Sequence, residues 1–323
     1  MSKFSEFGND LYSGARSINF IKQRKIWYIV ATIMVTLAVV LPVARGGFNF
    51  GIEFRGGSEF RIENVAGKSQ QLAIDAVHQV DSALEPIVTT VGQDAIRVQT
   101  VQLEDVESEE LRVALAASYG VDSADVTSSF VGANWGPDVS GKALNGLIVF
   151  VLLAAVLMAL YFRTVKMSVA AMLALLHDLI ITAGVYGAIG FEVTPAAVIG
   201  FLTILGYSLY DTVVVFDKIR ENTFEVEFSE KTTFAEQVNL AINQTLVRSI
   251  NTSVVAVLPV ASILFIGAVV LGAGTLRDIA LALFIGIIVG TYSTIFIAAP
   301  VYSHLREGED KYKKAAVKVL ASR

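Results

Sequence analysis

The sequence predicts an α-helical polytopic membrane protein with six transmembrane helices and an α+β domain between the first two. Hydrophobic residues make up 54% of the chain and charged residues only 17%, with a mean hydropathy of +0.60. A soluble globular surface does not tolerate that combination. Six stretches are long enough to cross a hydrocarbon core of about 30 Å. The loop between the first two stretches is long enough to be a domain.

The expected spans have apolar cores at 26–44, 143–162, 167–191, 193–216, 249–271 and 279–302. No small-x-small cleavage site follows the first span, so we interpret it as retained in the protein. The predicted organisation is a leading segment at 1–25, a first span at 26–45, a domain at 46–142, helices two to six at 143–302 with an amphipathic cytoplasmic helix near 233–247, and a tail at 303–323.

Basic residues beside the spans gather on one side of the expected bundle, whereas the opposite loops hold only Arg277. Because basic loops stay in the cytoplasm, both termini are expected there and the domain at 46–142 on the other side. The basic residues that set this orientation are Lys22, Arg24, Lys25, Arg163, Lys166, Lys218, Arg220, Arg306, Lys311, Lys313 and Lys314.

Composition also excludes several classes of function. The chain has no cysteine, so it holds neither a disulfide framework nor a thiolate metal site. Its net charge of −5 argues against general nucleic-acid binding. We expect no metal, no cofactor and no enzymatic activity.

The loop at 46–142 has the pattern of a ferredoxin-like α+β domain. Phe60 and Ile62 alternate with Arg61 and Glu63, as in a half-buried strand. The loop carries fifteen acidic and six basic residues, a net of −9, which favours a solvated surface over a docking face for a basic partner. The expected βαββαβ order is strand 58–65, helix 70–84, strand 87–91, strand 95–103, helix 108–119 and strand 126–131.

Asp211 is the most informative residue, because it is the one charged group between Ile199 and Phe216. A charged side chain at the bilayer centre costs about 2.5–3.5 kcal/mol on insertion scales, so such a group normally faces a bundle interior, a partner or a water path. Two interpretations stay open. Asp211 is either a proton or ion relay, or a structural hydrogen-bonding group between helices.

Other polar residues in or near the spans each have a functional and a plain interpretation. Asp178, next to His177, is a second intramembrane carboxyl or a local hydrogen-bonding group. Asp278 is a relay candidate or a charge that complements a helix N-terminus. Arg248 is a charge partner or a residue that extends its side chain to the membrane interface.

The stretch at 233–247 has an amphipathic stripe and starts with Thr233 and Glu236, the spacing of a capping box. We expect a helix along the cytoplasmic face that leads into the fifth span and brings Arg248 within reach of Asp211.

Small residues in the third and sixth spans indicate close helix packing. Gly286 and Gly290 form a GxxxG pair, and Gly184 and Gly187 lie in the third span. Such spacing lets backbones approach each other. We expect this surface to need a helix from a partner subunit.

Several motifs, in this order, resemble the SecF family of bacterial protein-export membrane subunits. The resemblance extends from the first span to the sixth, and no single motif would be specific alone. The motifs are residues 49–57 (NFGIEFRGG), the pair His177 and Asp178, residues 206–222 (GYSLYDTVVVFDKIREN) and residues 243–249 (NQTLVRS).

This resemblance implies a fold, partners and a mechanism. SecF proteins form half of a resistance-nodulation-division type bundle and pair with SecD in the bacterial inner membrane. The complex acts beside the SecYEG channel, with YajC and after the ATP-driven SecA step, and uses the proton gradient to draw unfolded polypeptides outward. The implied proton-relay residues are Asp211, with Arg248 as its charge partner, Asp278 and Asp178.

The resemblance also marks a junction between the first span and the domain, at Gly51, Glu53, Gly56 and Gly57. Glycines there supply flexible or positive-φ backbone. Glu53 stands where the family usually has Asp, which keeps the carboxylate. Tyr210 stands where Asn is usual, which removes an amide that would orient the next residue, Asp211.

Two other classes of function remain open at this stage. A homo-oligomeric, proton-driven small-molecule exporter of the same superfamily would share the six spans and the domain. A receptor or scaffold without transport would need no intramembrane carboxyl.

Overall fold

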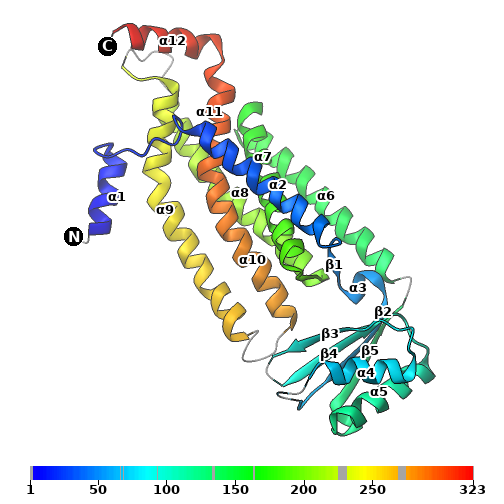
Figure 1. The fold of residues 1–323 in the computed structure, drawn as a ribbon. Coiled ribbons are helices and arrows are strands. Elements are labelled where there is room, and N and C mark those ends of the chain that lie inside the picture. The colour runs from blue at the N-terminus through cyan, green and yellow to red at the C-terminus, as the bar shows by residue number, and fades with distance from the viewer. Residues whose placement is uncertain are drawn as a thin grey trace.

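A bundle of long helices carries a small sheet domain at one end (Figure 1). We call that end of the bundle the domain end and the opposite one the far end. The computed structural model describes residues 3–322 except 66, 68, 93, 133–134, 163, 225–230 and 268–273. Arg163 and the predicted last residues of the fifth span, 268–271, therefore lie outside the described residues.

Six membrane-length apolar helical stretches are found in the described part of the chain, as predicted. The helices of the bundle and its flanks are α1 (Lys3–Ser13), α2 (Arg24–Ala44), α6 (Trp135–Phe162), α7 (Val165–Ile189), α8 (Pro195–Thr223), α9 (Phe234–Ser262) with a π-helical extension (Ile263–Gly267), α10 (Gly274–Ser293) with a π-helical extension (Thr294–Ala298), α11 (Ala299–Glu307) and α12 (Asp310–Ala321).

Helix α9 differs from its prediction, because the amphipathic stretch and the fifth span form one continuous helix. It begins with the expected capping box, in which Thr233 and Glu236 bond each other's backbone N–H groups. Nothing in the sequence between this cap and Pro259 breaks a helix. The polar half of α9 therefore continues the span toward the far end.

The sheet domain has the predicted βαββαβ order. Its elements are β2 (Gly57–Ile62), α4 (Gln71–Val80), β3 (Ile87–Val91), β4 (Ala95–Thr100), α5 (Asp105–Tyr119) and β5 (Val126–Val131). The strands lie in the order β3-β4-β2-β5, and each neighbouring pair is antiparallel. This is the arrangement of a ferredoxin-like domain.

The two faces of this sheet have different roles. Phe60, Ile62 and Val98 pack with the inner sides of α4 and α5 in a buried core. Since successive side chains alternate between faces, Arg97 and Gln99 on β4 lie on the other face, where both contact Glu192 of the bundle. Helix α5 begins three residues earlier than predicted, because the Glu107 carboxylate accepts a hydrogen bond from the Glu104 N–H and closes the first turn.

A short junction connects the first span to the sheet domain. Strand β1 (Asn49–Phe50) pairs in parallel with β6 (Glu192–Val193), the segment between α7 and α8, and α3 (Ile52–Arg55) follows β1. Gly56 and Gly57 have φ of 75° and 143°, which favour glycine. A Cβ on Gly57 would also lie 2.4 Å from the Thr100 carbonyl oxygen.

The glycines expected to face a partner subunit pack inside this chain instead, so that expectation was wrong. A Cβ on Gly184 would lie 2.6 Å from the Cα of Ala38 in α2, and one on Gly286 would lie 2.3 Å from Ile204 in α8. The spacing correctly indicated close approach of helices. It could not indicate which helices approach.

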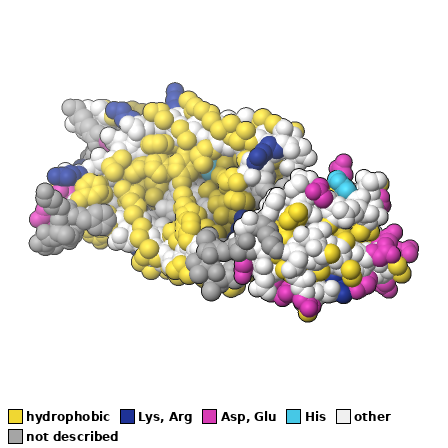
Figure 2. Space-filling model, turned by 60° about the horizontal axis from the view of Figure 1, so that its bottom comes forward, with side chains coloured by type: hydrophobic (Ala, Val, Ile, Leu, Met, Phe, Trp, Pro, Cys, Tyr) yellow, Lys and Arg dark blue, Asp and Glu magenta, His cyan; other side chains and the backbone are white. Residues whose placement is uncertain are grey.

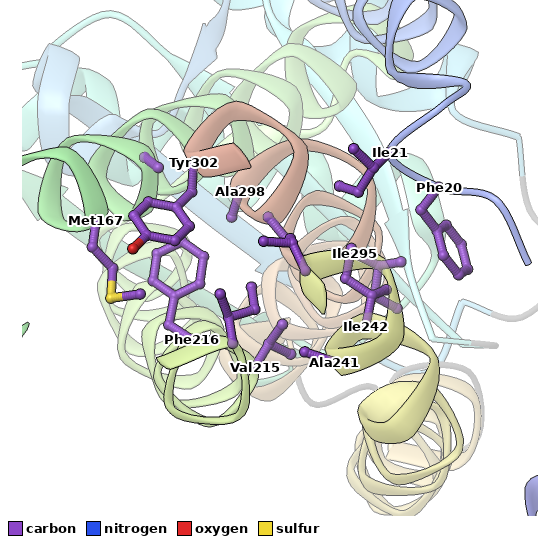
Figure 3. Close-up of a cluster of buried hydrophobic side chains, with 14 of the residues drawn as sticks. Phe20, Ile21, Met167, Val215, Phe216, Ala241, Ile242, Ile295, Ala298 and Tyr302 are labelled. Atoms are coloured by element: carbon purple, nitrogen blue, oxygen red, sulfur yellow. The ribbon is translucent and has the colours of Figure 1, made fainter. Parts of the chain in front are cut away.

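The far end of the bundle has its own core, where five spans and the N-terminal segment meet, and Figure 3 shows part of it. The Asn239 and Asn243 side chains on α9 accept hydrogen bonds of 2.8 Å from the backbone N–H groups of Phe20 and Ile18. These contacts fix the position of α9. The core includes Phe20, Ile21, Met167, Val215, Phe216, Ala241, Ile242, Ile295, Ala298 and Tyr302.

The surface separates by chemistry, with hydrophobic side chains over the bundle and many acidic ones on the sheet domain (Figure 2). Large apolar side chains are exposed along α2, α6 and the membrane half of α9, for example Ile29, Val149 and Val255. Exposed apolar helix faces of this extent fit contact with lipid or with partner helices.

Candidate functional site

Two carboxyls lie buried within the helix bundle, on neighbouring helices. Asp178 on α7 and Asp211 on α8 are only 1% and 7% exposed. Ser208 donates a hydrogen bond of 2.5 Å to Asp178, and Ser249 on α9 donates one of 2.9 Å to Asp211. Ser208 and Asp211 are three residues apart on α8, so both carboxyls border the same face of that helix.

Part of this cluster lacks hydrogen-bond partners. Among the described residues, nothing bonds the buried Oδ2 of Asp211, Nε2 of His177 or the hydroxyl of Tyr292. Buried polar atoms in folded proteins are nearly always bonded. Three such atoms on α7, α8 and α10 therefore mark this region, rather than the apolar core beside it, as the candidate functional site.

Hydroxyl groups extend the cluster across three helices. Thr212 on α8 bonds Thr294 at 2.9 Å, and Ser253 on α9 bonds Thr291 on α10 at 2.5 Å. Thr294 begins a π-helical segment, a feature often found at functional sites. We call these hydroxyl pairs, together with Asp178, Asp211 and the adjoining Gly290, the polar seam of the bundle.

Glycine allows α10 to approach this seam closely. A Cβ on Gly290 would lie 3.1 Å from the Ser208 hydroxyl and 3.6 Å from the Asp178 carboxylate. Any larger side chain would press on the bond between Ser208 and Asp178. Gly290 is therefore a part of the site that the sequence indicated only as a packing residue.

Arg248 lies close enough to Asp211 for the two charges to interact, as predicted, but it does not contact the carboxyl. Its side chain is exposed, and it forms no ion pair with Asp211 in the described structure. Neighbouring residues on a helix point in different directions. Ser249 thus takes the place expected for Arg248. The four-residue spacing of Ser249 and Ser253, which places both on one side of α9, could have indicated this face.

Asp178 forms local bonds as well as the bond with Ser208. His177 Nδ1 lies 3.3 Å from its carboxylate. This contact is the local pairing that the sequence left open, and it adds an ionisable ring to the cluster.

Asp278 belongs to a different place, at the domain end. It is twelve residues from Gly290, about 18 Å along a helix. Its carboxylate accepts a 2.8 Å hydrogen bond from Thr194, and its carbonyl accepts one of 2.8 Å from Tyr186. Asp278 is also the fifth residue of α10, beyond the first turn where a charge best complements the helix dipole.

A polar cleft of about 580 Å³ separates the sheet from the domain end of the bundle. The junction residue Glu53 lines it, with Arg97, Glu192 and Asp278. Burial raises the pKa of the Glu53 carboxyl, and the nearby charges of Glu192 and Glu59 add to this effect.

These features define a class of protein: a six-span membrane bundle of resistance-nodulation-division type with a ferredoxin-like domain after its first span. Residues 112–308 match the family model described as protein export membrane protein SecD/SecF, C-terminal, and residues 45–63 match the SecD/SecF GG motif. The chain belongs to the SecD/SecF family and is a multi-pass protein of the bacterial membrane.

Individual relatives agree with this assignment. The chain is 43% identical to protein translocase subunit SecF of Streptomyces coelicolor over all of its own length and 86% of that protein. It is 40% identical to SecF of Mycobacterium tuberculosis H37Rv over 98% of its length and 73% of that protein. The crystal structure of SecDF from Thermus thermophilus superposes with a TM-score of 0.76 at 30% identity, over 90% of this chain and 39% of that one.

Proposed function

We propose that this chain is the SecF subunit of a bacterial protein-export complex and couples the proton gradient to export through Asp211. The observation that carries the proposal is a buried carboxyl between α8 and α9 with one bonded and one unbonded oxygen, in a chain whose relatives are named protein translocase subunits. It acts with SecYEG, SecA and YajC on unfolded polypeptides and has no enzymatic activity.

The coupling step is a change of partner at Asp211. The ionised carboxylate accepts the Ser249 hydroxyl, and a proton on the free Oδ2 removes its charge. Movement of the Arg248 side chain, one residue before Ser249 on α9, toward Asp211 would bring a guanidinium to the carboxyl. The guanidinium favours the ionised form and so releases the proton. Each proton that crosses the membrane contributes about 2.3 kcal/mol per 100 mV, enough to bias a conformational equilibrium by tens of fold.

SecD is the proposed partner that completes a twelve-span bundle. The fused SecDF chain of Thermus thermophilus supports this, because the present chain covers only 39% of it. The exposed apolar faces of α2, α6 and α9 offer surface for helices of a second subunit. The alternative function, a homo-oligomeric exporter, predicts instead that these faces contact another copy of the same chain.

Co-purification distinguishes SecD from a second copy of the chain as the partner. An affinity-tagged chain, solubilised in mild detergent from its native membrane, is expected to elute with SecD in a fixed ratio. An untagged second copy of the chain, expressed with the tagged one, serves as the control. Elution of that copy without SecD would contradict the proposed function and favour the homo-oligomeric exporter.

The proposed orientation places both termini in the cytoplasm and the sheet domain outside. Since the chain has no cysteine, single cysteines report position without background. We expect Ser82→Cys in the sheet domain to react with a membrane-impermeant maleimide in intact spheroplasts, and Ser13→Cys in α1 to react only after lysis. Both side chains are exposed. Reaction of both residues from the same side would contradict the topology. Ser229, another site suited to this experiment by sequence, lies outside the described residues.

A further inference from the structure

One ion pair joins the sheet domain to the bundle among the described residues. Arg97 on the bundle-facing side of β4 pairs with Glu192, which lies between α7 and α8. The neighbouring Gln99 side chain, 4% exposed, donates 2.9 Å hydrogen bonds to Glu192 and to Glu59. The pair is itself largely shielded from solvent, with 27% and 18% of the two side chains exposed.

The segment that carries Glu192 is bonded to three helices of the bundle. Thr194 accepts the Ala197 N–H at the start of α8 and donates to Asp278 on α10. The Phe191 N–H of the segment donates to the Tyr186 carbonyl near the end of α7, and the Tyr186 hydroxyl donates to the carbonyl of the same Asp278. The segment is therefore tied to α7, α8 and α10 at their domain ends.

These three helices also carry the polar seam. Asp178 lies on α7, Asp211 on α8, and Gly290 with Thr291 on α10. Helices are stiff along their length, so a shift at the seam moves their domain ends. Glu192 lies in the segment where these helices contact the sheet domain through Arg97 and Gln99.

We propose that Arg97, Gln99 and Glu192 are positioning residues that form the joint through which proton-driven movement of the helices moves the sheet domain. This inference rests on the proposed function, because it assumes that Asp211 cycles. The proposal gives these three residues, which lie outside the membrane, a role in coupling. They take no part in proton binding.

Weakening this joint should separate proton flux from gradient-dependent export. In vesicles with SecD, SecYEG and SecA, Arg97→Glu or Glu192→Arg is expected to lower gradient-dependent export about fivefold, while proton flux through the complex persists. The exchange of both residues restores an ion pair, and the Gln99 amide can still accept or donate. The double variant should therefore recover to within about twofold of the unmodified protein.

Two further variants separate coupling from folding. Glu110→Arg reverses an exposed charge on α5, which covers the face of the sheet turned away from the bundle, and is expected to leave export unchanged. Glu192→Gln keeps the size of the side chain and is expected to lower export about twofold.

The possible results distinguish failure of the proposed joint from failure of the proposed function. Full export by both single reversals would overturn the joint, as would parallel loss of export and flux or a double variant without recovery. Absence of gradient dependence in the unmodified complex would instead overturn the proposed function.

Discussion

Asp211→Asn is expected to abolish the gradient-dependent part of export while the ATP-driven part survives. Asparagine keeps the size of the side chain and can still accept the Ser249 hydroxyl, which now bonds Asp211 at 2.9 Å. It cannot take up and release a proton. The variant should therefore assemble normally with SecD, and the loss should be visible as export that no longer responds to an uncoupler.

Variants at the two proposed partners test the same step. Arg248→Met is expected to give a similar defect, because Asp211 would then lack the guanidinium that favours proton release. Ser249→Ala should give a smaller defect, since it leaves that guanidinium in place. Gradient-dependent export that persists undiminished in Asp211→Asn would leave Asp211 as a structural group between helices.

Gly184→Leu is expected to prevent stable packing of α2 against α7. Its Cβ would lie 2.6 Å from the Ala38 Cα, a backbone atom that cannot move without shifting all of α2. Overpacking of a core typically costs about 1–3 kcal/mol, and contact with backbone places this site at or above the upper end. Thermal unfolding of the purified chain in detergent should show a large drop in midpoint, with poor recovery of folded protein.

Gly146→Leu is the matched control for this variant. Gly146 lies in α6 and has open space around the position of a Cβ. The same substitution there should leave the unfolding midpoint unchanged. Equal stability of both variants would show that α2 does not pack tightly on α7.

The fold of the sheet domain could be predicted from its sequence because the patterns that indicate it are local. Alternation along each strand and the turns between elements indicated the order, and the ferredoxin-like topology then left one arrangement of strands. Strand and helix ends were less certain. The Glu104 and Glu107 capping box, for example, extended α5 by one turn beyond its apolar pattern.

The contacts inside the bundle could be predicted less completely, because they join segments that are far apart in sequence. Asp211 and Asp178 stood out as carboxyls in apolar helices, and both are buried. Sequence spacing could bring α9 next to Asp211, but a rotation of one residue decides whether Ser249 or Arg248 faces it. The same limit explains why Gly184 and Gly286 indicated tight packing but not the helices involved.

Asp278 shows that the position of a charge along a span does not reveal its bonding partners. Its position near the end of a span fitted both a relay and a helix terminus. The structure bonds it to Thr194 and Tyr186 at the domain end, where it joins the helices to the segment that carries Glu192. Only the packing of α7, α8 and α10 reveals these partners.

Proton flux tests the central claim most directly, because it observes Asp211 without the export reaction. The chain and SecD are reconstituted into vesicles with a pH-sensitive dye inside, and a membrane potential is imposed. We predict proton uptake by the unmodified complex and no uptake above that of empty vesicles for Asp211→Asn. Equal uptake by the two proteins would contradict the assignment of Asp211 as the proton-carrying group.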